Sequence, residues 1–230
     1  MFSGILSALP NLICSAAVML ALVSASGTRA DNAERTDAPA VLIVGDSISA
    51  GFGVAIEQQW PLLLEQNLQQ QFPQLSVVAA AVSGDTTSGA RSRLPSLLKK
   101  HSPNVTLIAV GGNDALRGTP LSVVRSNLSA MISAAREAGS DVVLAGMQIP
   151  PNYGPAYTEG FRQIYYDLAE SYNTGLVPFL LEGIATVDGM MQDDGIHPTA
   201  EAQPLLSDNV MPEILLILEQ QVAEPRQPVE

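Results

Sequence analysis

Short apolar runs alternate with segments of helical periodicity along most of the chain. Four runs are rich in β-branched residues and show no strict alternation of polar and apolar positions: residues 41–44, 77–82, 105–110 and 142–147. Runs of this kind predict strands that are buried on both faces, as in a parallel sheet. Leu176 and Val177 indicate a short fifth strand.

Apolar residues at steps of three and four predict helices between these strands. The clearest segments are residues 60–72, 121–135, 157–172 and 200–222. Residues 91–100 also indicate a helix, but Pro95 predicts a kink or a split there. The alternation of strands and helices predicts one three-layer α/β/α domain, with a flavodoxin-like parallel sheet of about five strands and helices on both faces.

The N-terminus has the pattern of a targeting segment. Residues 12–23 form an apolar run of signal-peptide length, and small residues follow as far as Ala30. No Lys or Arg precedes the run, and an uncleaved anchor is the alternative, although the run is shorter than the ~20 residues that span a bilayer. We expect a signal peptide at residues 1–30, a loose tail at 31–39, the folded domain at 40–222 and a polar tail at 223–230. This organisation predicts a periplasmic or secreted protein with no stable membrane span.

Charge and cysteine content exclude several classes of function. The chain has 23 acidic and 11 basic residues, and loss of Arg29 with the signal peptide leaves 10 minus 23, or −13. Such a surface repels nucleic acid, so no nucleic-acid partner is expected, and we expect a monomer. Cys14, the only cysteine, lies in the expected signal peptide. With two histidines and no cysteine left, a zinc cluster is excluded, although carboxylates could still hold calcium.

Polar segments containing glycine follow three of the predicted strands: residues 45–47, 83–85 and 111–114. The carboxyl ends of parallel strands meet at one edge of a sheet, where ligands collect. The first segment, Gly45-Asp46-Ser47, is consistent with an ordinary turn, a phosphate-binding loop or a turn that displays a nucleophilic serine. These segments alone do not distinguish the three.

A second polar segment, residues 193–198 (DDGIHP), precedes the last predicted helix. Asp194 and His197 are three residues apart, so the carboxylate can hold one imidazole nitrogen while the other faces a serine hydroxyl. A phosphate-binding loop has no use for this pair. The alternative is a histidine at the surface near the start of a helix.

Taken together, four sequence blocks resemble the GDSL, or SGNH, hydrolase family. The blocks are Gly45-Asp46-Ser47-Ile48-Ser49, Ser83-Gly84-Asp85, Gly111-Gly112-Asn113-Asp114 and Asp194-Gly195-Ile196-His197. They occur in the family's order, and Ile48 replaces the usual leucine. Residues 40 to about 218 are covered, and the stretches SGDTTSGARSRLPSLLKKHSP, GGNDALRG, PPNYG and MQDDGIHP are most similar to the bacterial thioesterase I/lysophospholipase subgroup.

The resemblance implies a role for each block. It implies Ser47 as the nucleophile, His197 as the general base and then acid, and Asp194 as the residue that orients the imidazole. It implies an oxyanion hole made of the Ser47 and Gly84 backbone N–H groups and the Asn113 side-chain amide. Asp46 is then a turn former, and neither a metal nor another cofactor is needed.

The implied reaction is hydrolysis of acyl esters and thioesters, which are small-molecule substrates. In the subgroup, the loop after the fourth strand helps to line an acyl groove, so Ile149, Pro150 and Tyr153 are candidate groove residues. An ordinary loop stiffened by proline is the alternative. We expect Trp60 and the Met190-Met191 pair in the core. A carbohydrate O-deacetylase with the same machinery and a non-catalytic flavodoxin-like module remain as alternative functions.

Overall fold

The structure is a computed structural model that describes residues 39–224. The signal peptide predicted at residues 1–30 lies outside the described part, as do residues 31–38 and 225–230 of the predicted tails. Among the described helices, none combines the length and apolar character needed to cross a membrane.

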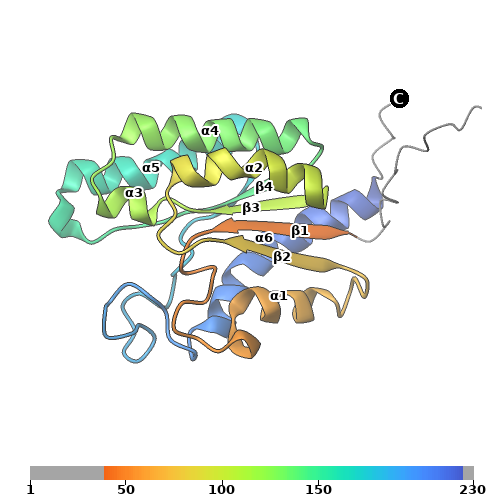
Figure 1. Cartoon of the computed structure of the whole chain (residues 1–230), viewed down its shortest axis with the longest axis horizontal. Coiled ribbons are helices and arrows are strands. Elements are labelled where there is room, and N and C mark those ends of the chain that lie inside the picture. Colours follow the sequence, from red (N-terminus) through yellow and green to blue (C-terminus); the bar gives the residue numbers. More distant parts are fainter. Residues whose placement is uncertain (1–38, 225–230) are drawn as a thin grey trace, which may run out of the picture. The chain divides into compact units, whose positions relative to one another are not determined.

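One parallel sheet of five strands forms the centre of the domain (Figure 1). The strand order is β2-β1-β3-β4-β5, with bounds Ala40–Gly45 (β1), Ser76–Ala81 (β2), Val105–Ala109 (β3), Asp141–Ala145 (β4) and Gly175–Val177 (β5). The predicted parallel sheet is therefore confirmed. From β1 the chain first moves to one side and then returns to the other, so the loops after β1 and β3 flank the point where a ligand site is expected.

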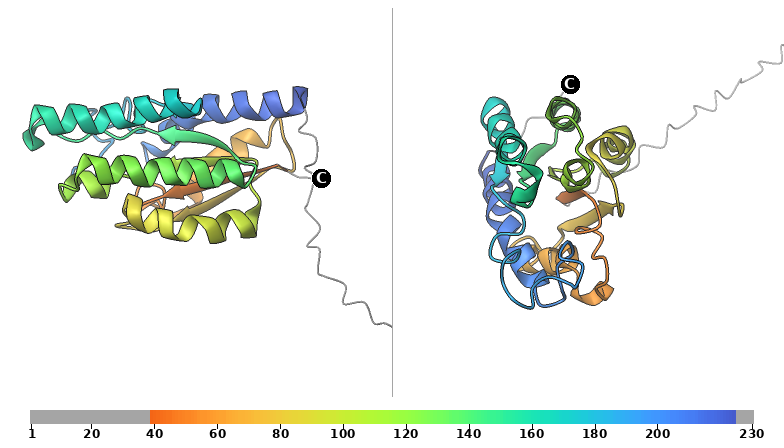
Figure 2. Two further views of the ribbon diagram at one scale, coloured as in Figure 1. Left: turned by 90° about the horizontal axis from the view of Figure 1, so that it is seen from above. Right: turned by 90° about the vertical axis from the view of Figure 1, so that its left-hand side faces the viewer.

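Helices cover both faces of this sheet (Figures 1 and 2). The helices α2 (Thr87–His101), α4 (Leu121–Glu137) and α5 (Pro155–Tyr172) pack together on one face. On the other face lie α1 (Trp60–Leu68) and α6 (Gln203–Ala223). Three short helices, η1 (Ile56–Gln58), α3 (Gly112–Leu116) and η2 (Pro151–Tyr153), lie within the connections. The three-layer α/β/α prediction is confirmed, but the sequence pattern did not predict α3.

One detail of the prediction is wrong, and the structure decides between two alternatives in another. No residue of β2 is fully buried, because β2 is an edge strand with a neighbour on one side only. Pro95 does not split α2, which is one helix over all its residues. Ala90, Leu94 and Leu98 are buried along α2, and their packing outweighs the backbone hydrogen bond that proline removes.

The core connects directly to the loop after β1. Residues 41–44 of β1 and all of β3 are buried. Trp60 is fully buried, as expected, and its indole N–H donates a hydrogen bond to the carbonyl of Ile48 at 3.2 Å. The backbone N–H of Trp60 donates to the side-chain carbonyl of Gln203 in α6 at 3.1 Å. The loop after β1 is therefore anchored to the helical layer beneath it.

Candidate active site

Ser47 lies in a tight turn directly after β1. The N–H of Ala50 donates to the carbonyl of Asp46 at 2.9 Å, and the N–H of Ile48 donates to Oδ1 of Asp46 at 3.1 Å. A Cβ atom at Gly45 would lie 2.3 Å from the Cβ of Ser49, so the turn requires glycine at that position. The strand therefore ends where Ser47 can reach a cavity at the carboxyl edge of the sheet.

His197 joins this serine to a carboxylate from the other end of the described chain. Its Nε2 atom lies 2.8 Å from Oγ of Ser47, and its Nδ1 atom lies 2.6 Å from Oδ2 of Asp194. The other carboxylate oxygen, Oδ1, accepts the backbone N–H groups of Ile196 at 2.9 Å and His197 at 3.0 Å. An imidazole held in this way can take a proton from a hydroxyl.

Hydrogen bonds also keep the orienting carboxylate ionised. They lower the pKa of Asp194 to about 2, with the His197 side chain as the largest cause and the backbone N–H groups next. The ring of Phe52 packs against the imidazole, with the two ring centroids 4.4 Å apart. The imidazole is thus fixed by a charge on one edge and by an aromatic ring on one side.

A glutamine that the sequence reasoning missed connects the two halves of this arrangement. The side-chain amide of Gln192 donates to the carbonyl of Phe52 at 2.8 Å and to the carbonyl of Pro198 at 2.9 Å. Its backbone N–H donates to the carbonyl of His197 at 2.8 Å. Gln192 therefore links the loop that carries Ser47 to the loop that carries His197. Its sequence position, next to two aspartates, gives no signal for this role.

Gly84 and Asn113 face the same cavity as Ser47. Gly84 has a φ of +77°, in the left-handed region that favours glycine, and its carbonyl accepts a hydrogen bond from Arg117 at 3.1 Å. No atom lies closer than 4.0 Å to a Cβ atom built on Gly84, so backbone conformation rather than lack of space explains this glycine. Asn113, in the first turn of α3, donates through Nδ2 to Oδ2 of Asp46 at 3.3 Å.

Asp46 therefore holds Asn113 as well as forming the turn that the sequence predicts. It is 2% exposed, and burial raises its pKa to about 6, against the opposing effect of the hydrogen bond from Ile48. One N–H of the Asn113 amide binds Asp46, which leaves the other N–H available as a donor. The sequence motif identifies Asp46 as a turn residue. It does not predict the contact of Asp46 with Asn113, which is 67 positions away in the chain.

Buried and partly buried polar contacts fix the loops that carry these groups. Oδ1 and Oδ2 of Asp114 accept hydrogen bonds from the hydroxyl and the backbone N–H of Thr87, both at 2.7 Å, which joins α3 to the start of α2. Arg93 donates to the carbonyl of Gly45 at 3.1 Å and to the carbonyl of Ala80 at 2.6 Å, and forms an ion pair with Asp85 at 2.8 Å. The ends of β1 and β2 are thus held together beside Ser47.

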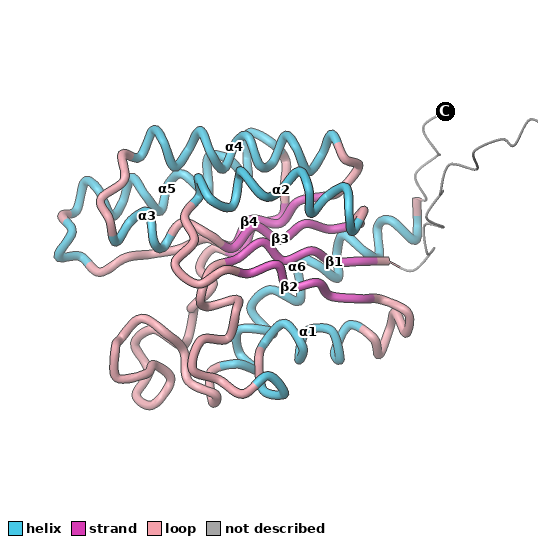
Figure 3. The backbone as a smooth tube through the Cα atoms, viewed as in Figure 1, coloured by secondary structure: helices cyan, strands magenta, loops and turns pink. Residues whose placement is uncertain are grey.

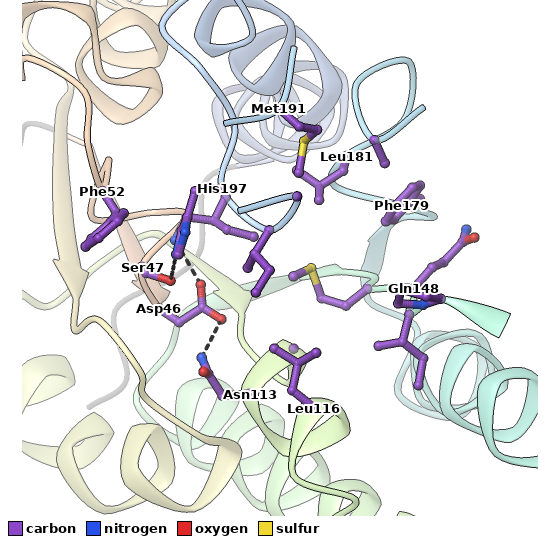
Figure 4. A pocket seen from close by; sticks show the side chains of 18 of the residues that line it. Asp46, Ser47, Phe52, Asn113, Leu116, Gln148, Phe179, Leu181, Met191 and His197 are labelled. Atoms are coloured by element: carbon purple, nitrogen blue, oxygen red, sulfur yellow. Dashed lines mark hydrogen bonds between the residues drawn. The ribbon is translucent and has the colours of Figure 1, made fainter. Parts of the chain in front are cut away.

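The cavity has a volume of about 760 Å³. Figure 4 shows His197, Ser47, Asp46 and Asn113 on one side of it, with Phe179 and Gln148 on the other. Most other lining residues are apolar, and they include Leu116, Met147, Ile149, Pro150, Leu181 and Met191. The enclosure suits an apolar group bound beside the Ser47 hydroxyl.

Two of the three candidate groove residues line this cavity. Ile149 and Pro150 line it, whereas Tyr153 lies in η2, outside the lining. Met190 and Met191 pack against the core, as expected, but Met191 also lines the cavity, which the sequence did not predict. The long connection after β5 turns this side chain towards the cavity. Within residues 39–224, no group of three His, Cys, Asp or Glu side chains is placed to hold a metal ion.

Known proteins match most of the chain. Residues 43–204, which include all four sequence blocks, match the GDSL-like lipase/acylhydrolase family. The chain is 45% identical over 185 residues to esterase TesA of Pseudomonas aeruginosa, covering 80% of this chain and 92% of that protein. It is 40% identical over 171 residues to thioesterase 1/protease 1/lysophospholipase L1 of Escherichia coli K12, covering 74% and 81%. A crystal structure of TesA matches with a TM-score of 0.75 at 46% identity, over 77% of this chain and 99% of that chain.

Proposed function

Because the chain belongs to the GDSL-like lipase/acylhydrolase family and is an ester hydrolase, we propose that it cleaves acyl esters and thioesters through an acyl intermediate on Ser47. The observation that carries this proposal is the distance of 2.8 Å between Nε2 of His197 and Oγ of Ser47. A hydroxyl in direct contact with an oriented imidazole is the arrangement that nucleophilic acyl transfer requires.

In the proposed mechanism, His197 accepts the hydroxyl proton of Ser47 as Oγ attacks the carbonyl carbon of the ester. The negative oxygen that forms accepts hydrogen bonds from the N–H groups of Ser47 and Gly84 and from the free N–H of Asn113. His197 then gives its proton to the departing alcohol or thiol. Water, activated by the same imidazole, releases the acid and restores Ser47. Asp194 stays ionised and stabilises the imidazolium at both steps.

The cavity lining supports an acyl chain as the group that is bound. Apolar side chains such as Leu116, Ile149 and Met191 offer little to a carbohydrate, whose hydroxyls need hydrogen-bond partners. The names of the relatives, esterase and thioesterase/lysophospholipase, agree with this substrate class. Export, the monomeric state and the lack of a nucleic-acid partner stay predictions.

Replacing Ile149 with aspartate tests the acyl groove. Ile149 lines the cavity and packs against the core, so a carboxylate there must be desolvated whenever a long acyl chain binds. We expect kcat/KM for decanoyl esters of p-nitrophenol to fall at least about tenfold more than kcat/KM for the acetyl ester. Activity on the acetyl ester also reports that the variant is folded.

Tyr153→Ser is the matched control, because Tyr153 belongs to the same connection and does not line the cavity. This variant is expected to keep the chain-length profile of the wild type. Equal losses of kcat/KM on acetyl and decanoyl esters in Ile149→Asp would show that this loop does not line the acyl groove. A wild type that accepts only acetyl esters would favour the carbohydrate O-deacetylase.

Replacing Asp46 with asparagine is expected to remove a pH-dependent loss of stability and to lower activity. The pKa of Asp46 is about 6 in the folded chain and near 3.8 in the unfolded chain, so the folded state binds the proton more tightly. Stability is therefore lost as the pH rises from about 4 to about 6, by about 3 kcal/mol at most. Asparagine avoids this loss, but it has one side-chain acceptor for the two N–H groups, from Ile48 and Asn113, that the carboxylate accepts.

Chemical denaturation of Asp46→Asn and wild type at pH 8 and pH 4 measures the effect on stability. The stability of the variant relative to wild type should be higher at pH 8 than at pH 4, by up to about 3 kcal/mol, because only the wild type pays to ionise the buried carboxyl. Its kcat is expected to fall about tenfold to a hundredfold, because the Asn113 amide loses its acceptor and turns. An unchanged kcat would show that Asp46 does not position Asn113.

A further inference from the structure

Large apolar side chains are exposed mainly in the connections that follow the strands. Within residues 39–224, ten large apolar side chains are exposed, and seven of them lie between the end of a strand and the start of the next long helix. We call these seven the apolar rim: Phe52, Ile56, Val82, Leu116, Tyr153, Val187 and Ile196. Single exposed apolar residues are common on proteins, so their gathering in one kind of segment is the informative feature.

These connections lie at the edge of the sheet that carries the site. All five strands are parallel, so every strand-to-helix connection starts at the carboxyl edge, where Figure 3 shows the loops together. Phe52, Leu116 and Ile196 of the apolar rim also line the cavity beside Ser47. Ile56, 71% exposed, is the most exposed member. Three of the seven residues of the apolar rim therefore also belong to the apolar wall of the cavity.

Charges in the same connections limit what can lie against this edge. Glu57, Asp188 and Asp193 are exposed there, and Arg117 is the only Lys or Arg in these connections. An anionic surface would be repelled, which matches the net charge of −12 on the whole chain. A surface without net charge meets no such barrier.

We propose that the apolar rim docks on the surface of aggregated neutral or zwitterionic lipid. In this pose the cavity opens onto the lipid, so an acyl chain passes from one apolar environment into another without crossing water. The inference rests on the proposed cleavage of acyl esters and adds the physical state of the substrate: lipid in a micelle or bilayer. Docking involves no change in covalent bonds.

Vesicle flotation measures the docking directly. The probe is a vesicle of diether phosphatidylcholine, which contains no ester for the enzyme to cleave. The wild-type chain is expected to float with these vesicles, and less with vesicles of diether phosphatidylglycerol. The double variant Ile56→Ser/Val187→Ser should lower the partition coefficient about tenfold or more, because two exposed side chains outside the cavity lining lose their apolar contact.

The matched control is Leu216→Ser/Val222→Ser, which removes two exposed apolar side chains from α6. This control should float as the wild type does. The proposal is overturned if the wild type does not float with phosphatidylcholine, if both double variants lose binding equally, or if phosphatidylglycerol binds better. It is also overturned if Ile56→Ser/Val187→Ser abolishes self-association of the chain and leaves flotation unchanged.

Hydrolysis of p-nitrophenyl acetate separates this test from the test of the proposed function. The acetyl ester is dissolved as single molecules, so Ile56→Ser/Val187→Ser should cleave it at the wild-type rate, which also shows that the variant is folded. A chain that floats with vesicles but does not cleave the acetyl ester would contradict the proposed function alone. A chain that cleaves the acetyl ester but does not float would contradict the docking alone.

Discussion

Ser47→Ala is expected to lower kcat on p-nitrophenyl esters by at least about 10⁴-fold. Alanine removes the oxygen that lies 2.8 Å from Nε2 of His197, and no acyl intermediate can then form. The oxyanion donors and the cavity remain, so a small residual rate and nearly unchanged substrate binding are expected. Steady-state kinetics with a highly purified variant measure both quantities.

A second serine provides the matched control. Ser83 also lines the cavity, but it lacks the contact with His197, so Ser83→Ala should keep kcat within a few-fold of the wild type. A fluorophosphonate should add its mass to the wild type and to Ser83→Ala at residue 47, and should not modify Ser47→Ala. Labelling at another serine, or full activity of Ser47→Ala, would end the assignment of the nucleophile.

Asp194→Asn is expected to lower kcat by about 10⁴-fold while leaving the fold intact. The carboxylate now accepts the proton on Nδ1 of His197 at 2.6 Å, which leaves Nε2 free to accept from Ser47. An asparagine amide facing Nδ1 would donate instead, and the ring proton would move to Nε2. That tautomer cannot take the proton of Ser47.

The pH dependence of this loss follows from the state of the carboxylate. The pKa of Asp194 is lowered to about 2, so the group is ionised at every pH from 4 upwards, and the loss should be similar from pH 5 to pH 9. Asp193→Asn is the matched control, since Asp193 is the neighbouring carboxylate and makes no contact with the imidazole among the described residues. A large loss of kcat in Asp193→Asn, with little loss in Asp194→Asn, would show that Asp193 and not Asp194 orients the imidazole.

The parallel sheet could be predicted because its strands are short, β-branched and bounded by glycine. The position of β2 at the edge of the sheet could not be predicted, because residues 77–82 are as apolar as a central strand. The sequence does not show how many neighbours a strand has in the sheet. The helix α3 was missed for a related reason. It has five residues, fewer than one repeat of the apolar pattern by which a helix is recognised.

The part of the candidate site that lies in the sequence motifs could be predicted. Ser47, Asp194 and His197 were expected together from residue chemistry and family resemblance, and the structure places them in contact. The groups that hold them, Gln192 above all, act through contacts between distant loops. An amide that donates to two backbone carbonyls has no sequence signature, because any glutamine could do so.

Ser47 and His197 are separated by 150 positions, about four-fifths of the described residues 39–224. Their meeting therefore depends on every strand being paired and on the last loop reaching the first. On the proposed mechanism, a refolding chain with all its helices formed but with the segment around His197 undocked is catalytically silent. The return of ester cleavage after dilution from denaturant thus reports only those molecules in which this segment has docked. It should lag behind the return of the helical signal in circular dichroism.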